Sequence, residues 1–198
     1  LTLNVTRQSS HFEDILDVNY QFLDGIAAQI SSDGILISEK NRNMLSAIKS
    51  TTSIDHVSLI EPDGTAHYET GEVKDVSHRE YFQEGISGHR ILSDPVQSSL
   101  DHETRVILGV PVSHNGNIIG LLGASYNVTA LNHLMFDDLF DGKGFCIIIN
   151  ENGDIITLDG NSTCQKITYD DNFFDFYSQC SIRGKDSLQA IRDAFQTQ

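Results

Sequence analysis

The sequence predicts an α+β fold in which a long N-terminal helix and a second helix precede an antiparallel sheet of five strands. Three observations support this prediction. An apolar repeat of helical period runs from Phe12 to Ile30, strand-like alternation replaces it after Ser53, and a strand-turn-strand pattern begins again at Lys143. We therefore divide the chain into an N-terminal helical region (1–53), a first sheet lobe (54–136) and a second, incomplete lobe (137–198).

The long first helix carries an apolar seam with alternating spacings of four and three residues. The seam consists of Phe12, Leu16, Asn19, Leu23, Ile26 and Ile30. Such heptad spacing favours pairing with the same helix of a second copy, where the polar Asn19 would set the register. The alternative is an amphipathic helix packed on its own domain, because Ile15, Phe22 and Ala27 widen the apolar stripe.

The segments that follow alternate between helix, strand and turn signals. A second helix is expected from Glu39 to Ser50, and a connecting helix from Thr129 to Phe136. A short helix is expected from Ser77 to Gly85, with Ser77 and Glu80 forming a capping box. Strands are expected at Asp55–Ile60, Thr65–Thr70, Arg90–Gln97, Thr104–Ser113 and Asn117–Asn127, with turns at Glu61–Gly64 and His114–Asn117.

The second lobe repeats part of this pattern. GKGFCIIINENGDIITLDG reads as two strands joined at Asn152-Gly153, followed by a polar loop, the aromatic cluster Phe173–Tyr177, and a helix near Asp186–Phe195. The three further strands of a complete second lobe are missing from the sequence.

Composition excludes several classes of function. The formal net charge of −15 disfavours binding to nucleic acid or anionic lipid. The sequence contains no run of 18 apolar residues and no N-terminal signal-peptide pattern. No catalytic or metal-binding motif stands out, so we expect neither an enzyme nor a cofactor in this domain.

The cysteines and histidines leave further possibilities open. Cys164 and Cys180 lie in polar sequence and could form a disulfide, whereas Cys146 lies in an apolar run; three free buried thiols are the alternative. The eight histidines have no metal-ligand spacing, so we expect them to be solvated surface residues.

The motifs REYFQEG, SDPV and VPVSHNGNIIGLLGAS occur in that order between Val76 and Val128. In this ordered set the chain resembles the double Cache (dCache) extracellular sensor domain of bacterial transmembrane receptors, and the resemblance covers roughly Phe12 to Leu158. The resemblance implies a PAS-like antiparallel sheet in each of two lobes, and a ligand pocket in the membrane-distal lobe.

The resemblance also implies which residues bind ligand. Arg79 matches the arginine that holds the ligand carboxylate in amino-acid-binding members, and Tyr81 and Phe82 match its aromatic neighbours. Two acidic residues that would hold an ammonium group are replaced, by our alignment, by Ser98 and Ser125, and a tyrosine is replaced by Lys74. We add Asp94 and Tyr68 as candidate pocket residues. An unpaired ammonium would be costly to bury, so we expect an organic acid rather than a free amino acid.

These features predict an extracytoplasmic domain that binds a small ligand and signals through membrane helices outside this sequence to a cytoplasmic kinase, chemoreceptor or cyclic-di-GMP output. The expected assembly is a homodimer through the N-terminal helix, at the cell membrane, with this domain on the outside. The alternatives are a ligand-free dimerisation module, which predicts a pocket filled by the protein's own side chains, and a periplasmic solute-binding protein.

Overall fold

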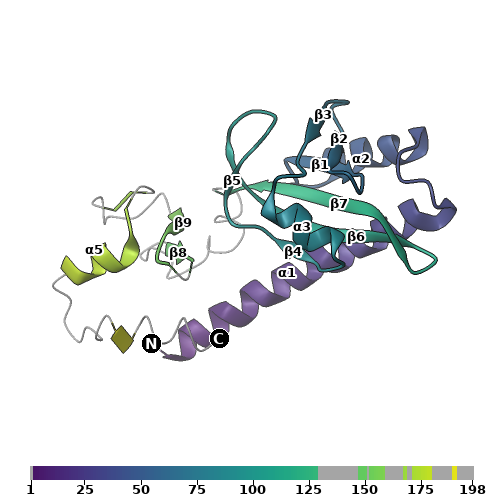
Figure 1. The fold of residues 1–198 in the computed structure, drawn as a ribbon. Coiled ribbons are helices and arrows are strands. Elements are labelled where there is room, and N and C mark those ends of the chain that lie inside the picture. The colour runs from purple at the N-terminus through teal and green to yellow at the C-terminus, as the bar shows by residue number, and fades with distance from the viewer. Residues whose placement is uncertain are drawn as a thin grey trace. The chain divides into compact units, whose positions relative to one another are not determined.

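A computed structural model describes residues 2–128, 147–150, 152–158, 167–168, 171–179 and 189–190 of the chain. The chain divides into two compact units, Leu1–Asn127 and Val128–Gln198, which are described separately. The first unit contains both N-terminal helices and the main sheet (Figure 1). Among the described residues, no helix combines the length and the hydropathy needed to cross a bilayer.

The first unit is built on one antiparallel, seven-stranded sheet in the order β3-β2-β1-β7-β6-β4, with β5 also paired to β6. Its strands are β1 (His56–Ile60), β2 (Thr65–Tyr68), β3 (Val73–Asp75), β4 (Ile91–Leu92), β5 (Val96–Gln97), β6 (Thr104–His114) and β7 (Asn117–Asn127). The predicted α+β class is confirmed. The strand expected at Arg90–Gln97 is split into β4 and β5, and β3 was not predicted, so the sheet has seven strands instead of five.

The β6–β7 hairpin forms the centre of the sheet and follows directly from local sequence. Asn115 and Gly116 connect the two strands with positive φ angles of 52° and 80°. Asn and Gly tolerate these angles better than other residues, and two such residues make the turn that matches strand twist. The predicted hairpin is therefore confirmed, and it brings Arg105 opposite Asn127 and Ile107 opposite Ser125.

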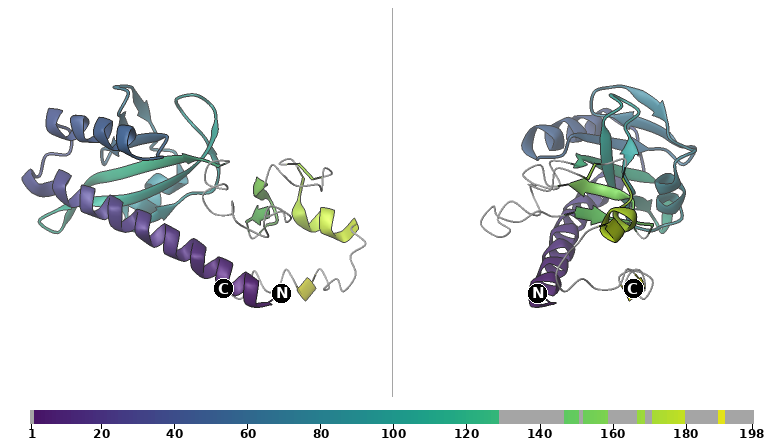
Figure 2. Two further views of the ribbon diagram at one scale, coloured as in Figure 1. Left: turned by 180° about the vertical axis from the view of Figure 1, so that it is seen from behind. Right: turned by 90° about the vertical axis from the view of Figure 1, so that its left-hand side faces the viewer.

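Helices α1 (Thr2–Ile30) and α2 (Glu39–Thr51) cover one face of this sheet, opposite α3 (Figure 2). α1 packs mainly on β6 and α2 on β1. A 3-10 turn, η1 (Ser31–Asp33), joins them, and Ser38 caps α2 by accepting a hydrogen bond from the Asn41 backbone N–H at 3.2 Å. Buried residues of α1 are Tyr20, Leu23, Ala27 and Ile30.

The burial of the α1 side chains shows which part of the predicted seam packs on the first unit itself. Leu23 and Ile30 are fully buried against the first unit, so this part of the seam packs on its own domain. Asn19 accepts a 2.9 Å hydrogen bond from the Tyr126 hydroxyl, and burial raises the pKa of Tyr126 to about 12, which keeps the phenol a neutral donor. The outward side of the helix exposes Val18 and Phe22 instead. The side chain of Phe12 lies outside the described residues.

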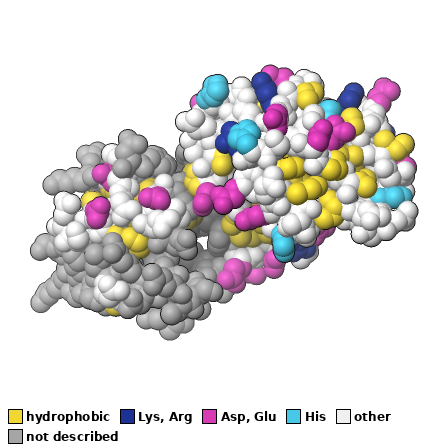
Figure 3. Space-filling model, viewed as in Figure 1, with side chains coloured by type: hydrophobic (Ala, Val, Ile, Leu, Met, Phe, Trp, Pro, Cys, Tyr) yellow, Lys and Arg dark blue, Asp and Glu magenta, His cyan; other side chains and the backbone are white. Residues whose placement is uncertain are grey.

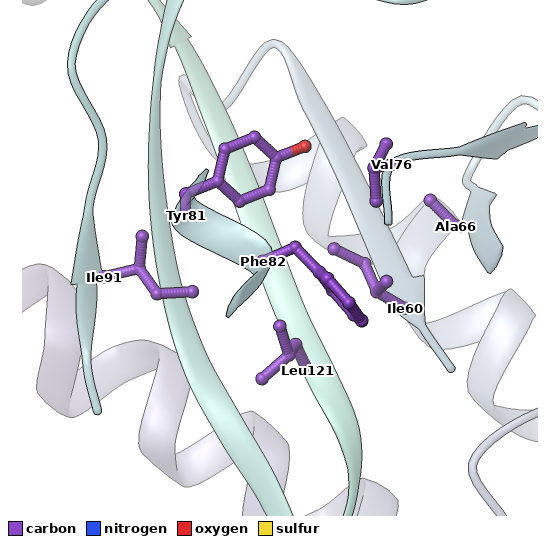
Figure 4. Packing of buried hydrophobic residues seen from close by; sticks show 7 residues of the cluster. All are labelled: Ile60, Ala66, Val76, Tyr81, Phe82, Ile91 and Leu121. Carbon is purple, nitrogen blue, oxygen red and sulfur yellow. The ribbon is translucent and has the colours of Figure 1, made fainter. Parts of the chain in front are cut away.

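Helix α3 (Glu80–Ile86) covers the other face of the sheet. The cluster beneath it, shown in Figure 4, consists of Ile60, Ala66, Val76, Tyr81, Phe82, Ile91 and Leu121. Full burial of each large apolar side chain contributes about 1.5–3 kcal/mol. In the space-filling view of this face, hydrophobic side chains gather beside α3 over the sheet (Figure 3).

The predicted start of α3 is wrong. The helix begins at Glu80, with Arg79 at the N-cap position and no side-chain capping bond, so Ser77 and Glu80 do not form a capping box. The physical reason is a competing acceptor: the Ser77 N–H donates to Asp75 Oδ1 at 2.8 Å. A backbone hydrogen bond of 2.9 Å from Arg79 N–H to the Val76 carbonyl then closes a turn before the helix.

The second unit contains an antiparallel hairpin of β8 (Ile147–Ile149) and β9 (Ile155–Leu158), and a helix, α5 (Phe173–Gln179). The predicted strand-turn-strand at Asn152-Gly153 is confirmed, with Gly153 at φ 86°. The Phe173 N–H donates to the Gly153 carbonyl at 2.7 Å, which holds α5 against the hairpin turn. The predicted helix at Thr129–Phe136, the helix near Asp186–Phe195 apart from 189–190, and the three cysteines lie outside the described residues.

Candidate ligand-binding site

A cavity lies in the first unit, at the end of the sheet where β5 pairs with β6. Its volume is about 30 Å³, which is room for roughly two water molecules. It is lined by His56, Ser58, Ile60, Tyr68, Arg79, Tyr81, Val96, Gln97, Ser98, Ser99, Arg105, Ile107, Gly123 and Ser125. None of these lining residues is acidic, and two of them are arginines.

Arg79 reaches the cavity from the N-terminus of α3. Its Nη2 donates a 3.1 Å hydrogen bond to the Gln97 carbonyl on β5. Burial raises the pKa of Tyr81 and of Tyr68, and the nearby Arg79 charge opposes that rise for both phenols. Arg79 therefore lies close to two neutral phenol groups. A guanidinium beside aromatic walls suits a small molecule that carries a carboxylate.

Only one residue of the aromatic pair lines the cavity. Tyr81 lines the cavity and its hydroxyl points away from Ile91 and Leu121, as Figure 4 shows. Phe82 does not line the cavity; it packs beneath α3 in the cluster with Ile60 and Leu121. Consecutive helical residues point in directions about 100° apart, so only one of the two can face the cavity.

The other predicted residues also divide into those that line the cavity and those that do not. Ser98, Ser125 and Tyr68 line the cavity together with Arg79 and Tyr81. Asp94 does not, because it lies exposed in the connection between β4 and β5. Lys74 does not line it either: it lies in the edge strand β3, where its Nζ is 3.7 Å from Glu72 Oε1.

His56 is a cavity residue that sequence reasoning missed. Its side chain is only 19% exposed, so the expectation of a solvated surface histidine is wrong at this position. Its Nδ1 lies 2.7 Å from Glu69 Oε1 and its Nε2 lies 3.6 Å from Asp101 Oδ2. Glu69 also accepts a 3.0 Å hydrogen bond from the Val57 backbone N–H. These two carboxylates hold the imidazole at the wall of the cavity.

Arg105 is the second missed residue and the more deeply buried of the two arginines that line the cavity. Its side chain is 8% exposed, with Nη2 donating to Asp101 Oδ2 at 2.5 Å and Nη1 lying 2.7 Å from Asp55 Oδ2. In the sequence, Arg105 is the one charged residue in the apolar run TRVILGVPV. This isolated charge could have marked it as a candidate site residue. Its acidic partners explain how a buried charge is tolerated.

The ion pair predicts how acid changes stability. The hydrogen bond from Arg105 holds the pKa of Asp101 well below its ordinary value of 3.8. A carboxyl whose pKa is lower in the folded than in the unfolded state stabilises the fold above pH 3.8, and the contribution is lost as the pH falls below that value. Asp101→Asn should therefore melt lower than the parent at pH 6, and the difference should shrink as the pH falls from about 4 to about 2.

Thermal melts across that pH range measure the effect. Asp94→Asn is the control, because it removes an exposed carboxylate that does not pair with Arg105. A constant difference between parent and Asp101→Asn at every pH would contradict the ion-pair assignment.

The architecture of this chain is similar to that of proteins with solved structures. No protein-family model matches the chain, and no curated protein sequence matches it. Solved structures do. The ligand-binding domain of the Campylobacter jejuni chemoreceptor Tlp3, in complex with L-valine, aligns with a TM-score of 0.62 and 17% identity over 77% of this chain and 67% of that one.

Two Pseudomonas chemoreceptor domains are also similar. The ligand-binding domain of P. aeruginosa PAO1 PctC, in complex with GABA, has a TM-score of 0.62 and 16% identity over 76% of this chain and 72% of that one. The domain of P. fluorescens CtaA, in complex with L-serine, has a TM-score of 0.70 and 14% identity over 92% of this chain and 79% of that one. The chain thus has the fold of dCache-type chemoreceptor sensor domains, as the resemblance predicted.

Proposed function

We propose that this chain is the extracytoplasmic sensor domain of a bacterial transmembrane receptor, and that it binds a small carboxylate at Arg79. The observation that carries the proposal is the convergence of Arg79, Tyr81, Tyr68, Ser98 and Ser125 on one cavity. The similar chemoreceptor domains were crystallised with amino acids or GABA, all of which carry a carboxylate. A ligand carboxylate at Arg79 would accept charge-assisted hydrogen bonds from the guanidinium.

The lining of the cavity favours an acid without an ammonium group. The nearest carboxylates are already engaged, Glu69 with His56 and Asp101 with Arg105. An ammonium group placed among the described lining residues would meet two guanidinium groups and no carboxylate. Desolvating that ammonium without a partner is costly, so amino acids should bind more weakly than acids of the same size.

Binding is expected to move part of the cavity wall, because Arg79 already donates its hydrogen bond to the Gln97 carbonyl. The carboxylate would replace the Gln97 carbonyl as the partner of Arg79, and β5 and the following loop would move outward. We expect β5 to be the part of the wall that moves most easily, because it pairs with β6 over only two residues. Ligand binding would favour the open arrangement, and the receptor would transmit that difference through the membrane to its output domain.

A thermal-shift screen of organic acids, amino acids, amines and purines tests the proposal. A ligand at a hundredfold excess over its dissociation constant stabilises the folded domain by about 2.7 kcal/mol. For a protein of this size we expect melting-temperature increases on the order of 5–10 °C with small carboxylates. Stabilisation by amines or purines alone would contradict the proposal, as would silence across the whole library.

The proposal includes a homodimer in which α1 faces its copy. Since Leu23 and Ile30 pack inside the first unit, the available contact is the outward side of the helix. Val18 and Phe22 lie there, with 66% and 42% of their surfaces exposed, and they are separated by one helical turn. Exposed apolar residues at this spacing suit a helix-helix contact, and tethering in the membrane would raise the effective concentration of the partner.

Phe22→Ser tests this assembly. Sedimentation experiments over a range of concentrations should show a dimer whose dissociation constant rises at least tenfold in the variant, which corresponds to about 1.4 kcal/mol. Val73→Ser is the control, because Val73 is a similarly exposed apolar residue, at 53%, on β3 rather than α1. Equal effects of the two substitutions would rule out α1 as the contact.

A further inference from the structure

We infer that Arg105 forms a second anion-binding subsite of the same cavity, so that the ligand is a small dicarboxylate. The inference rests on the proposed function and extends it from one carboxylate to two. It begins with an imbalance of hydrogen bonds. Arg105 is buried, and its Nε and Nη1 groups have no hydrogen-bond acceptor among the described residues.

The two acidic partners of Arg105 leave these donors unused. Asp101 accepts a hydrogen bond from Nη2 only. Asp55 Oδ2 lies 2.7 Å from Nη1, but no N–H of Nη1 points along that line, and this oxygen already accepts the Asn127 backbone N–H at 2.5 Å. The guanidinium therefore has two carboxylates beside it and is still not saturated in hydrogen bonds. Buried donors without acceptors are rare in folded proteins, and each one calls for a partner.

The position of Arg105 makes a ligand group a suitable partner. Arg105 lines the cavity that also contains Arg79. The two side chains are connected through β5, because Arg79 donates to the Gln97 carbonyl and the neighbouring Val96 pairs with Arg105. Each guanidinium presents a planar set of N–H donors that matches a carboxylate.

The remaining wall is also consistent with an acceptor-rich ligand. Ser58, Ser98, Ser99 and Ser125 contribute hydroxyls, and no lining residue carries a negative charge. A monocarboxylate at Arg79 would leave the Arg105 donors unsatisfied, whereas a second carboxylate would accept from them. The ligand class with the best match is thus a short, flexible dicarboxylate.

The first test uses the unaltered protein and requires no substitution. Calorimetric titration compares a series of straight-chain dicarboxylates with their monomethyl esters, in which the second carboxylate is neutral. We expect at least one dicarboxylate to bind tenfold or more tightly than its ester. Equal affinities across the series would overturn the second subsite.

Variants then assign the two subsites. Arg105→Lys retains a positive charge beside Asp55 and Asp101 but loses the planar set of donors. It should lower the affinity for the dicarboxylate at least tenfold and the affinity for the ester much less. Arg79→Gln should weaken both ligands.

The outcomes separate this inference from the proposed function. If esters and dicarboxylates bind equally and both depend on Arg79 alone, the carboxylate sensor stands and the Arg105 subsite does not. If neither ligand binds the unaltered protein, the proposed function fails first. Should Arg105→Lys not fold, the comparison of dicarboxylate and ester on the parent protein still decides the question.

Discussion

Arg79→Ala should weaken binding of a small carboxylate by about thirtyfold, or roughly 2 kcal/mol. This value is the lower end of what truncating a buried charge pair costs, because the Arg79 side chain is only partly buried and water remains close to it. The substitution removes the charge and the fork of donors without disturbing the core, since the Arg79 side chain donates its hydrogen bond to the Gln97 carbonyl. Titration calorimetry on parent and variant measures the change.

Arg90→Ala provides the matched control. Arg90 is also a partly exposed arginine, paired with Asp24 at 2.5 Å, and it does not line the cavity. Both substitutions change the net charge of the domain by the same amount, so any general effect of charge on anion binding cancels. An Arg79→Ala variant that binds as tightly as Arg90→Ala would remove Arg79 from the site.

Gly64→Ala should lower the free energy of unfolding by about 2–4 kcal/mol. Gly64 has φ +91°, and a Cβ there would lie 2.5 Å from both Cα and Cβ of Ser77. Its carbonyl also accepts the Val76 N–H at 2.9 Å. The clash is with backbone, which no side-chain rotation relieves.

Gly71→Ala separates the clash from the backbone strain. Gly71 has nearly the same angle, φ +87°, but no described atom lies within 4 Å of the Cβ position. Strain alone should cost about 1 kcal/mol there. Chemical denaturation of the two variants gives the comparison, and equal losses would show that the turn at Gly64 does not pack against Ser77.

The Gly64 contact also links stability to the site. The turn containing Gly64 supports the segment Val76–Arg79, which delivers Arg79 to the cavity. We therefore expect that any Gly64→Ala protein that folds has reduced carboxylate affinity, whereas Gly71→Ala retains it. This outcome would connect the β1–β2 turn with ligand binding.

Local sequence was sufficient for much of the fold. The β6–β7 hairpin follows from Asn115-Gly116 between alternating apolar residues, and α2 follows from Ser38 as its N-cap. The start of α3 could not be predicted in the same way, because Ser77 had two possible roles. Asp75 takes the Ser77 N–H, and only the position of β3 decides between that bond and a helix cap.

Five residues predicted from the sequence line the cavity: Arg79, Tyr81, Ser98, Ser125 and Tyr68. Arg79 and Tyr81 came from the resemblance of REYFQEG and do line the cavity. Phe82 packs in the core, and Asp94 and Lys74 lie away from the cavity, because side-chain direction depends on the exact helix start and on the split of β4 from β5. Arg105 was missed because one of its two partners, Asp55, is distant in sequence and is brought to it only by the pairing of β1 with β7 and of β7 with β6.

The most direct test of the central claim is a crystal structure of the domain with the tightest carboxylate from the screen. We predict the carboxylate within hydrogen-bonding distance of the Arg79 guanidinium, with Tyr81 and Tyr68 beside it and the Arg79 bond to Gln97 broken. A ligand bound elsewhere, or a carboxylate that contacts neither Arg79 nor the residues around it, would contradict the account.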